Sequence, residues 1–179
     1  DIKNIGPEAF AWSLMEATGI IDAQRNAVVA ELDKNSPLSD ADKQDSAKLA
    51  ARDMAIEKGV HAKLVGVENE FIGLYANAAG QPQDEFISTV DQALFFSNGG
   101  RVRGWLNPSG GNLVDRLLKT EESGALANEL YLAVFTRYPS EPEVARVTQY
   151  LADRGDQRTE AVQEMVWALL ASAEFRFNH

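Results

Sequence analysis

The sequence contains no cysteine and only two histidines, and it has neither an excess of basic residues nor a long hydrophobic run. Without cysteine, this segment forms no disulfide, thiolate zinc site, iron–sulfur cluster or covalent haem attachment. The longest nearly continuous apolar run, 165–173, is far shorter than the roughly 20 residues that a membrane-spanning helix needs. The composition therefore predicts no membrane span.

Acidic residues outnumber basic residues, 27 against 17, and the formal net charge is −10. Nucleic-acid backbones are bound mainly by clustered lysine and arginine, so we expect no nucleic-acid partner. The 179 residues, of which 45% are hydrophobic, are enough to enclose a core. We expect one all-helical domain over 1–179, and the alternative is a division into two lobes, 1–97 and 112–179.

Apolar residues recur at steps of three and four along most of the chain, and no stretch sustains the alternation of a strand. The predicted fold class is all-α, an irregular bundle of about eight to ten helices. The sequence has no repeat with a period of about 20 to 50 residues, so a solenoid is not expected. The expected helices cover 7–19, 22–35, 39–58, 61–79, 84–98, 112–118, 123–137, 140–155 and the segment from 159 onward.

Local signals predict where several helices begin. Ser140 and Glu143 have the spacing of a capping box, and Asn112 and Asp22 are expected to be N-caps. The segment 123–137 is apolar nearly all round, which predicts a central helix.

Two neighbouring segments differ in their apolar content. The segment 39–58 has a thin stripe, formed by Ala47, Ala50, Ala51 and Met54, which predicts a weakly attached surface helix. The segment 61–79 carries larger side chains at helical spacing and is expected to contribute to the core through Leu64, Val67 and Phe71.

The least regular stretch is 93–116, ALFFSNGGRVRGWLNPSGGNLVDR, which contains two Gly-Gly pairs and an Asn-Pro step. Glycine and asparagine favour backbone that leaves helical geometry. We predict an irregular junction near 97–112, where an N-terminal helical half folds back onto a C-terminal half. This junction is the expected place for a site.

The candidate ligand-binding or partner-binding residues of the junction are polar or aromatic: Asn98, Arg101, Arg103, Trp105, Asn107 and Asn112. Backbone N–H groups at 109–112 could bind an anion together with the two arginines. However, there is no Walker-type lysine, and Asp115 would repel an anion. The alternative is a tight turn whose arginines pair with acids such as Asp91 or Glu129.

Two interpretations are also open for Trp105. Beside Arg103, its indole could stack on a sugar or on a partner's side chain. Alternatively, it seals the junction as part of the core, since large aromatic residues dominate burial.

No catalytic, metal or cofactor site is predicted. Two buried carboxylates could perform acid–base chemistry if they were close, but caps and ion pairs are the favoured role for the candidate acids. Neither histidine belongs to a paired metal motif, and the segment 33–44 lacks the glycine and the final glutamate of a calcium loop. The acids considered, with a neighbouring base, are Glu129, Glu141, Glu143, Glu174 and Arg137.

Four segments carry a resemblance to a known family: FAWSLMEATG, QALFFSNGGRVRGWL, ANELYLAVFTRYPSEPEVARVTQYL and VQEMVWALLASAEFRFNH. Together they resemble the C-terminal domain of unknown function in large exported proteins of planctomycete-type bacteria, which often carry a cytochrome c-like domain nearer the N-terminus. The resemblance covers about 4–20 and 86–179. Its most specific pieces are the residues Glu129, Leu130, Tyr131, Arg137, Pro139 and Glu143 and the closing segment 173–179.

The resemblance implies a helical module at the end of a larger exported polypeptide, in a periplasmic or extracellular location, and it implies no reaction. Residues 22–85 match no part of the family pattern and are expected to be an insertion particular to this chain.

Three functional hypotheses follow. The first is a noncatalytic interaction module that packs, through the Gly-rich junction, against upstream domains of its parent chain or against an extracellular or periplasmic partner. The second is a small-ligand or glycan-binding domain that uses the 101–112 loop, with a glycan or a small anion as ligand. The third is a hydrolase that uses two of the acids. A broad apolar patch near Trp105 favours the first hypothesis, a concave polar cleft favours the second, and two close buried carboxylates in a cleft favour the third.

Overall fold

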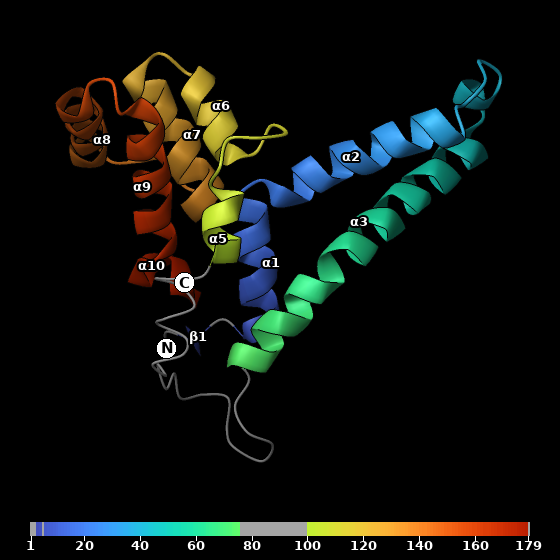
Figure 1. Ribbon diagram of the computed structural model, residues 1–179, viewed down its shortest axis with the longest axis horizontal. Helices are drawn as coiled ribbons and strands as arrows, with labels where there is room; N and C mark the ends of the chain where they lie inside the picture. The colour runs from blue at the N-terminus through green and yellow to red at the C-terminus, as the bar shows by residue number, and fades with distance from the viewer. Residues whose placement is uncertain (1–2, 5, 76–99, 179) are drawn as a thin grey trace.

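The computed structural model describes residues 3–4, 6–75 and 100–178, and these form a helical bundle from which a two-helix arm projects (Figure 1). The described residues contain nine α-helices, which confirms the all-α fold class. The elements are β1 (Lys3–Asn4), α1 (Pro7–Ala17), α2 (Ile20–Asn35), the 3-10 turn η1 (Asp42–Gln44), α3 (Ser46–Tyr75), α5 (Gly100–Trp105), α6 (Leu113–Lys119), α7 (Ser123–Phe135), α8 (Glu141–Arg154), α9 (Arg158–Leu170), α10 (Ala173–Arg176) and β2 (Phe177–Asn178).

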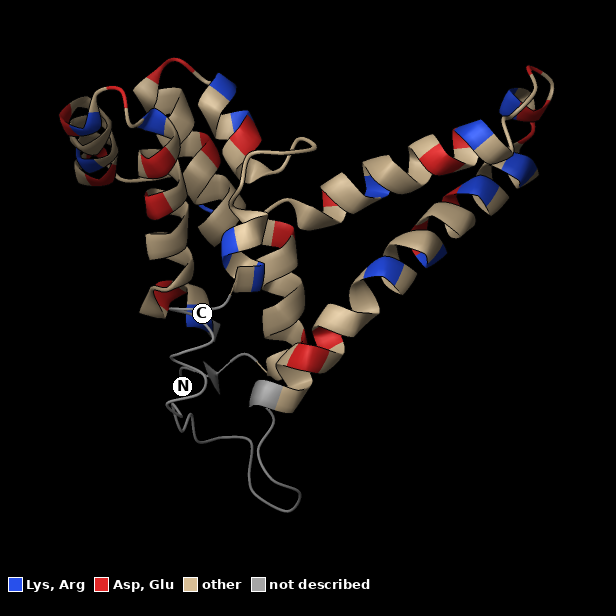
Figure 2. Cartoon of the chain, in the orientation of Figure 1, with Lys and Arg blue, Asp and Glu red and all other residues tan. Residues whose placement is uncertain are grey.

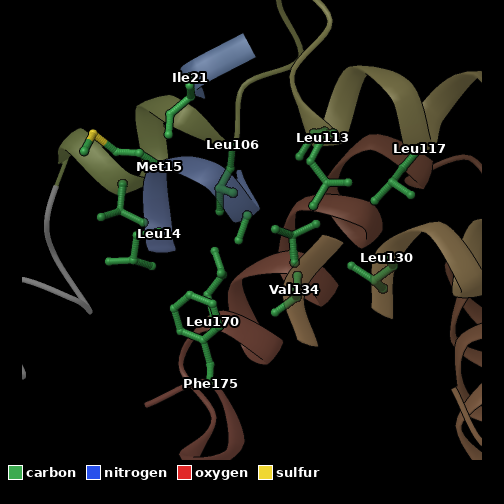
Figure 3. Close-up of a cluster of buried hydrophobic side chains, with 14 of the residues drawn as sticks. Leu14, Met15, Ile21, Leu106, Leu113, Leu117, Leu130, Val134, Leu170 and Phe175 are labelled. Carbon is green, nitrogen blue, oxygen red and sulfur yellow. The ribbon is translucent and has the colours of Figure 1, made fainter. Parts of the chain in front are cut away.

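The core of the bundle lies between α1, α6, α7 and α9, and α8 and α10 pack on its outside. Leucines from different helices meet there, and Phe175 of α10 lies beside Leu170 (Figure 3). Helix α7 is central as predicted, because it contacts α1, α6, α8, α9 and α10. The fully buried leucines of this core are Leu14, Leu113, Leu117, Leu126, Leu130 and Leu170.

The arm, residues 22–58, consists of α2, η1 and the first part of α3. Figure 1 shows α2 and α3 meeting at a tip far from the bundle and separating toward it, where α1 lies between their inner ends. Val28 is the only residue of 22–58 that is buried. The prediction that 39–58 is a surface element is therefore confirmed, although this segment is not a separate helix.

Helix α3 runs without interruption from Ser46 to Tyr75, whereas the sequence pattern divided it near residue 60. The apolar stripe changes face there because Ala47, Ala50, Ala51 and Met54 lie on the exposed side of α3, whereas the buried side of the second half contacts α1. Leu64, Val67 and Phe71 are buried as expected. Gly59 lies within the helix, where a β-carbon would come within 2.8 Å of Val28 Cγ1, so the glycine allows α2 and α3 to approach.

The observed caps match two of three expectations. The capping box of Ser140 and Glu143 is formed at the start of α8, and the Asn112 side chain caps α6 by accepting a hydrogen bond from the Asp115 N–H. Asp22 is not an N-cap, because α2 already begins at Ile20 and Gly19 occupies the N-cap position. Asp22 instead lies in the first turn, where an acid favours the helix dipole.

The turn between α1 and α2 packs tightly against the start of α6. The Leu113 N–H donates to the carbonyl oxygen of Thr18 at 3.0 Å. Gly19 has φ of 74°, and a β-carbon there would lie 3.0 Å from the Leu113 nitrogen. A glycine is therefore required both by the left-handed backbone and by the close approach.

The two ends of the described chain meet in a short antiparallel pair, in which Lys3 faces Asn178 and Asn4 faces Phe177. Two residues are too few to produce an alternating pattern, so the sequence contained no signal for this pair.

Part of the predicted layout lies outside the described residues, namely the helix at 84–98 with Asn98 and Asp91. The described part of the junction begins with α5, and its irregular part is the loop from Leu106 to Asn112. The division into lobes and the insertion at 22–85 stay predictions.

Candidate functional site

The loop between α5 and α6 is held in place by the buried side chain of Asn112, which is 0% exposed. Its Nδ2 donates to the carbonyl oxygens of Trp105 at 2.8 Å and Asn107 at 2.7 Å. Its Oδ1 accepts from the backbone N–H of Asp115 at 2.9 Å. Because all three partners are backbone groups, the hydrogen bonds of Asn112 fix the end of α5 relative to the start of α6.

Helix α5 points its two arginines in different directions. Residues two apart on a helix are separated by about 200° around its axis. Arg101 forms an ion pair with Glu70 of α3, with 2.7 Å between Nε and Oε2. Arg103 instead lines a cleft toward α9. The two arginines therefore do not converge on one anion, and the partner of Arg101 differs from the two acids considered for it.

A cleft of about 400 Å³ lies between the end of α5 and one face of α9. Arg103 and Asn107 of the predicted site line one side of this cleft. Gln163 joins the two sides, because its Nε2 donates to the Leu106 carbonyl oxygen at 3.0 Å and to Asn107 Oδ1 at 3.2 Å. The lining residues are Arg103, Leu106, Asn107, Glu160, Gln163, Glu164 and Trp167.

The charges in the cleft have different surroundings. The Glu164 carboxylate accepts hydrogen bonds from the hydroxyl of Tyr150 and from Arg154, and the bond from Tyr150 is the main reason that its pKa is lowered. Arg103 and Glu160 have no ion-pair partner among the residues that the structure describes. The cleft therefore offers one uncompensated cation and one uncompensated carboxylate.

The backbone turn ahead of α6 is occupied by the chain's own carboxylate. Asp115 Oδ2 accepts from the Gly111 N–H at 3.0 Å and from Lys119 Nζ at 3.1 Å. These hydrogen bonds lower the pKa of Asp115, and the bond from Lys119 has the larger effect. An exogenous anion would have to displace this carboxylate.

Arg137 gathers two of the acids that the sequence singled out. Its guanidinium makes a bidentate pair with Glu143, at 2.9 and 3.0 Å, and its Nε lies 2.7 Å from Glu174 Oε1. It also lies over the rings of Tyr131 and Phe135, 5.2 and 5.4 Å from their centroids. This cluster, which we call the Arg137 cluster, connects α7, α8 and α10.

The electrostatics of the Arg137 cluster are those of an ion pair. The hydrogen bonds from Arg137, assisted by the Ser140 N–H, lower the pKa of Glu143 to about 2. A general acid needs a pKa raised toward neutral pH, so Glu143 has the opposite shift. Glu129 pairs elsewhere, with Arg116 at 2.8 Å. Glu141 is an exposed residue at the start of α8.

Trp105 does not line the cleft. Trp105 is half-buried and packs against the hydrophobic core. Asn98 is outside the described residues.

Sequence reasoning missed the α9 side of the cleft, although a signal was present. Glu160, Gln163, Glu164 and Trp167 recur at steps of three, one and three, so they share one face of the helix. That face was overlooked because the apolar residues Val162, Val166 and Leu170 predicted a core helix.

A second hollow, of about 490 Å³, lies on the other side of Trp167, between α8 and α9. It shares Glu164 and Trp167 with the cleft, but its remaining lining residues are largely apolar, among them Val147, Met165 and Ala168. Nothing in the structure indicates what covers this hollow.

Within the described part of the chain, no group of three or more histidine, cysteine, aspartate or glutamate residues is arranged to hold a metal ion. No helix among the described residues has the length and apolar character needed to cross a membrane.

Comparison of the chain with protein-family models, with curated proteins and with solved structures gives no match.

Proposed function

We propose that this chain is a noncatalytic assembly module and that its arm binds a helical segment of another protein or of another domain of the same polypeptide. The observation that carries the proposal is the arm itself, which leaves the bundle with only Val28 buried over residues 22–58. The family resemblance, with the larger exported polypeptide that it implies, is part of the same proposal.

The arm has little to stabilise it as a free-standing structure. Helices in proteins gain most of their stability from packing of an apolar face, and the seam between α2 and α3 is thin. Within the arm its only buried residue is Val28, and Leu32 and Ile56 are partly buried. A partner that covered the outer side of the arm would add the missing packing.

The outer side of α3 has a stripe that a helix can pack against. Ala47, Ala50 and Ala51 are exposed, and Met54 is the most exposed large hydrophobic residue among those described, at 74%. This stripe lies opposite Arg52, whose side chain is only 11% exposed and reaches Asp33 of α2. Alanines let helix axes approach closely, and methionine adapts to varied partner surfaces.

Charge favours a protein partner over a nucleic acid. Basic and acidic side chains are both present along each helix of the arm (Figure 2). A phosphate backbone needs a continuous basic surface, whereas mixed charges complement another mixed helical surface.

The described carboxylates support a noncatalytic role. Glu143 and Glu174 approach the same guanidinium, that of Arg137, and the pKa of Glu143 is lowered rather than raised. Two carboxylates that share one guanidinium form a structural connection between helices, and the lowered pKa of Glu143 is the opposite of what acid catalysis uses.

Site-specific photo-crosslinking tests the proposal. A photoreactive residue at position 54 should cross-link to a helical segment of a partner or upstream domain in the native host, and the cross-linked peptide is identified by mass spectrometry. The matched control is position 138, because Tyr138 is 68% exposed but belongs to the bundle. The same peptide should disappear when Ala50→Glu is added.

Equal cross-linking from positions 54 and 138, or a product that Ala50→Glu leaves unchanged, would contradict arm-mediated assembly. Circular dichroism of the variants shows that each retains its helices, so that loss of the product is not caused by unfolding.

A further inference from the structure

We propose that the cleft between α5 and α9 binds a neutral saccharide, with the indole of Trp167 as its stacking surface. Arg103, Asn107 and Glu160 would form the hydrogen-bonding rim. This proposal is independent of the arm, because every residue that lines the cleft lies in the bundle.

The cleft is preorganised by hydrogen bonds that leave Arg103 and Glu160 unused and involve Asn107 only through its two oxygen atoms. Gln163 ties α9 to Leu106 and Asn107 at 3.0 and 3.2 Å, and Asn112 holds the same end of α5 from the other side. A ligand would therefore not have to order the two walls, and preorganisation lowers the cost of binding.

The charge balance selects a neutral ligand. Arg103 and Glu160 stand open on opposite walls, whereas the charge of Glu164 is compensated by Arg154. An anion would be attracted by Arg103 but repelled by Glu160, and a cation would meet the opposite conflict. A polyhydroxyl compound avoids both conflicts, because each hydroxyl can donate to a carboxylate and accept from a guanidinium.

The composition of the lining also suits a sugar. A saccharide has an apolar face of C–H groups and a rim of hydroxyls, which match an aromatic side chain flanked by polar groups. Trp167 provides the aromatic surface beside Arg103 and Glu160, and Leu106 adds apolar surface. The volume of about 400 Å³ is within the range of small-molecule sites.

The test is a titration of the whole chain with glucose, galactose, mannose, N-acetylglucosamine and cellobiose, followed by calorimetry and by indole fluorescence. Inorganic phosphate and glycine are titrated in parallel, as an anion and a zwitterion. We expect at least one saccharide to bind, and we expect Trp167→Leu to weaken its binding by about tenfold, the loss expected for one stacking contact.

The chain offers a matched pair of controls on one helix. Arg103→Ala should weaken saccharide binding, whereas Arg101→Ala should not, because Arg101 pairs with Glu70 outside the cleft. Both arginines are exposed, so replacing either one should leave the core unchanged. The comparison of these two variants can therefore be made even if Trp167→Leu does not fold.

Three results would overturn the proposal. No saccharide of the panel binds, or phosphate or glycine binds while the saccharides do not, or Arg103→Ala and Arg101→Ala bind the saccharide equally.

Discussion

The bundle and the arm are both made of amphipathic helices, but they are held together by different forces. In the bundle, leucines such as Leu117, Leu126 and Leu130 are completely removed from water. In the arm, the helices are joined mainly by exposed ion pairs, including Arg25 with Glu57 and Lys63 with Glu31. Burial of a leucine contributes about 1.5–3 kcal/mol, whereas an exposed ion pair contributes about 0–1 kcal/mol.

The difference shows that helix length is a poor guide to stability in this molecule. The longest helix, α3, has 30 residues, yet its first half has little buried surface. Helix α7 has 13 residues and is the centre of the core. The following predictions separate the two regions experimentally.

The largest effect is expected at the centre of α7. Leu130→Ala removes a side chain that is 0% exposed, and such a change costs about 2–5 kcal/mol through lost burial and the cavity left behind. The measurement is the free energy of unfolding in urea. The control is Leu132→Ala on the same helix, because Leu132 is 39% exposed. Similar losses from both variants would mean that α7 is not central.

The next effect tests the contact between α2 and α3. Gly59→Ala places a methyl group 2.8 Å from Val28 Cγ1, and such overpacking costs about 1–3 kcal/mol. Gly66→Ala in the same helix meets nothing within 4 Å and should stabilise the protein by up to about 1 kcal/mol through helix propensity. Thermal unfolding should therefore show shifts of opposite sign. Adding Val28→Ala should relieve the clash at residue 59.

A smaller effect concerns pH and the Arg137 cluster. The folded pKa of Glu143 is about 2, below its ordinary value of 4.5, so its ion pair stabilises the fold above pH 4.5. This contribution is lost as the pH falls from 4.5 toward 2, because the unfolded state then takes up the proton first. Glu143→Gln should flatten the pH dependence of stability in that window.

Glu141→Gln is the matched control for the pH prediction, since Glu141 begins the same helix and is exposed. It should leave the acid limb of the stability curve unchanged. If both variants flatten the curve equally, the effect arises from the helix N-terminus in general and not from Arg137.

The smallest effect is expected on the outer side of the arm. Met54→Glu should change the free energy of unfolding by no more than about 0.5 kcal/mol, as is usual for exposed positions. Urea unfolding measures this change beside that of Leu130→Ala. A loss comparable to that of Leu130→Ala would show that Met54 is covered by the protein itself.

Much of the fold could be predicted because it depends on local signals. The capping box at Ser140 and the Asn112 cap need only residues three apart, and the apolar pattern of α7 is independent of its partners. The continuity of α3 could not be predicted in this way. The exposed apolar residues of 47–54 and the buried ones of 64–71 lie on different sides of α3, and in sequence such a shift near Gly59 looks like the end of one helix and the start of another.

The candidate site was predicted only on one side. Arg103 and Asn107 stood out because they lie in an irregular stretch. The opposite wall is formed by Glu160 and Trp167 of α9. The two walls are far apart in the sequence: Gln163 and Asn107, for example, are 56 residues apart. Such long-range neighbours become visible only when α5 and α9 are placed together.

The uninterrupted helix α3 also has a mechanical consequence. With 30 residues and a rise of about 1.5 Å per residue, α3 is a rod of about 45 Å, so a rotation of about 10° at its bundle end moves its tip by about 8 Å. Phe71 near the inner end contacts Phe10 of α1, with 6.1 Å between the ring centroids. Force applied at the tip is therefore transmitted as torque to the aromatic contact between α3 and α1.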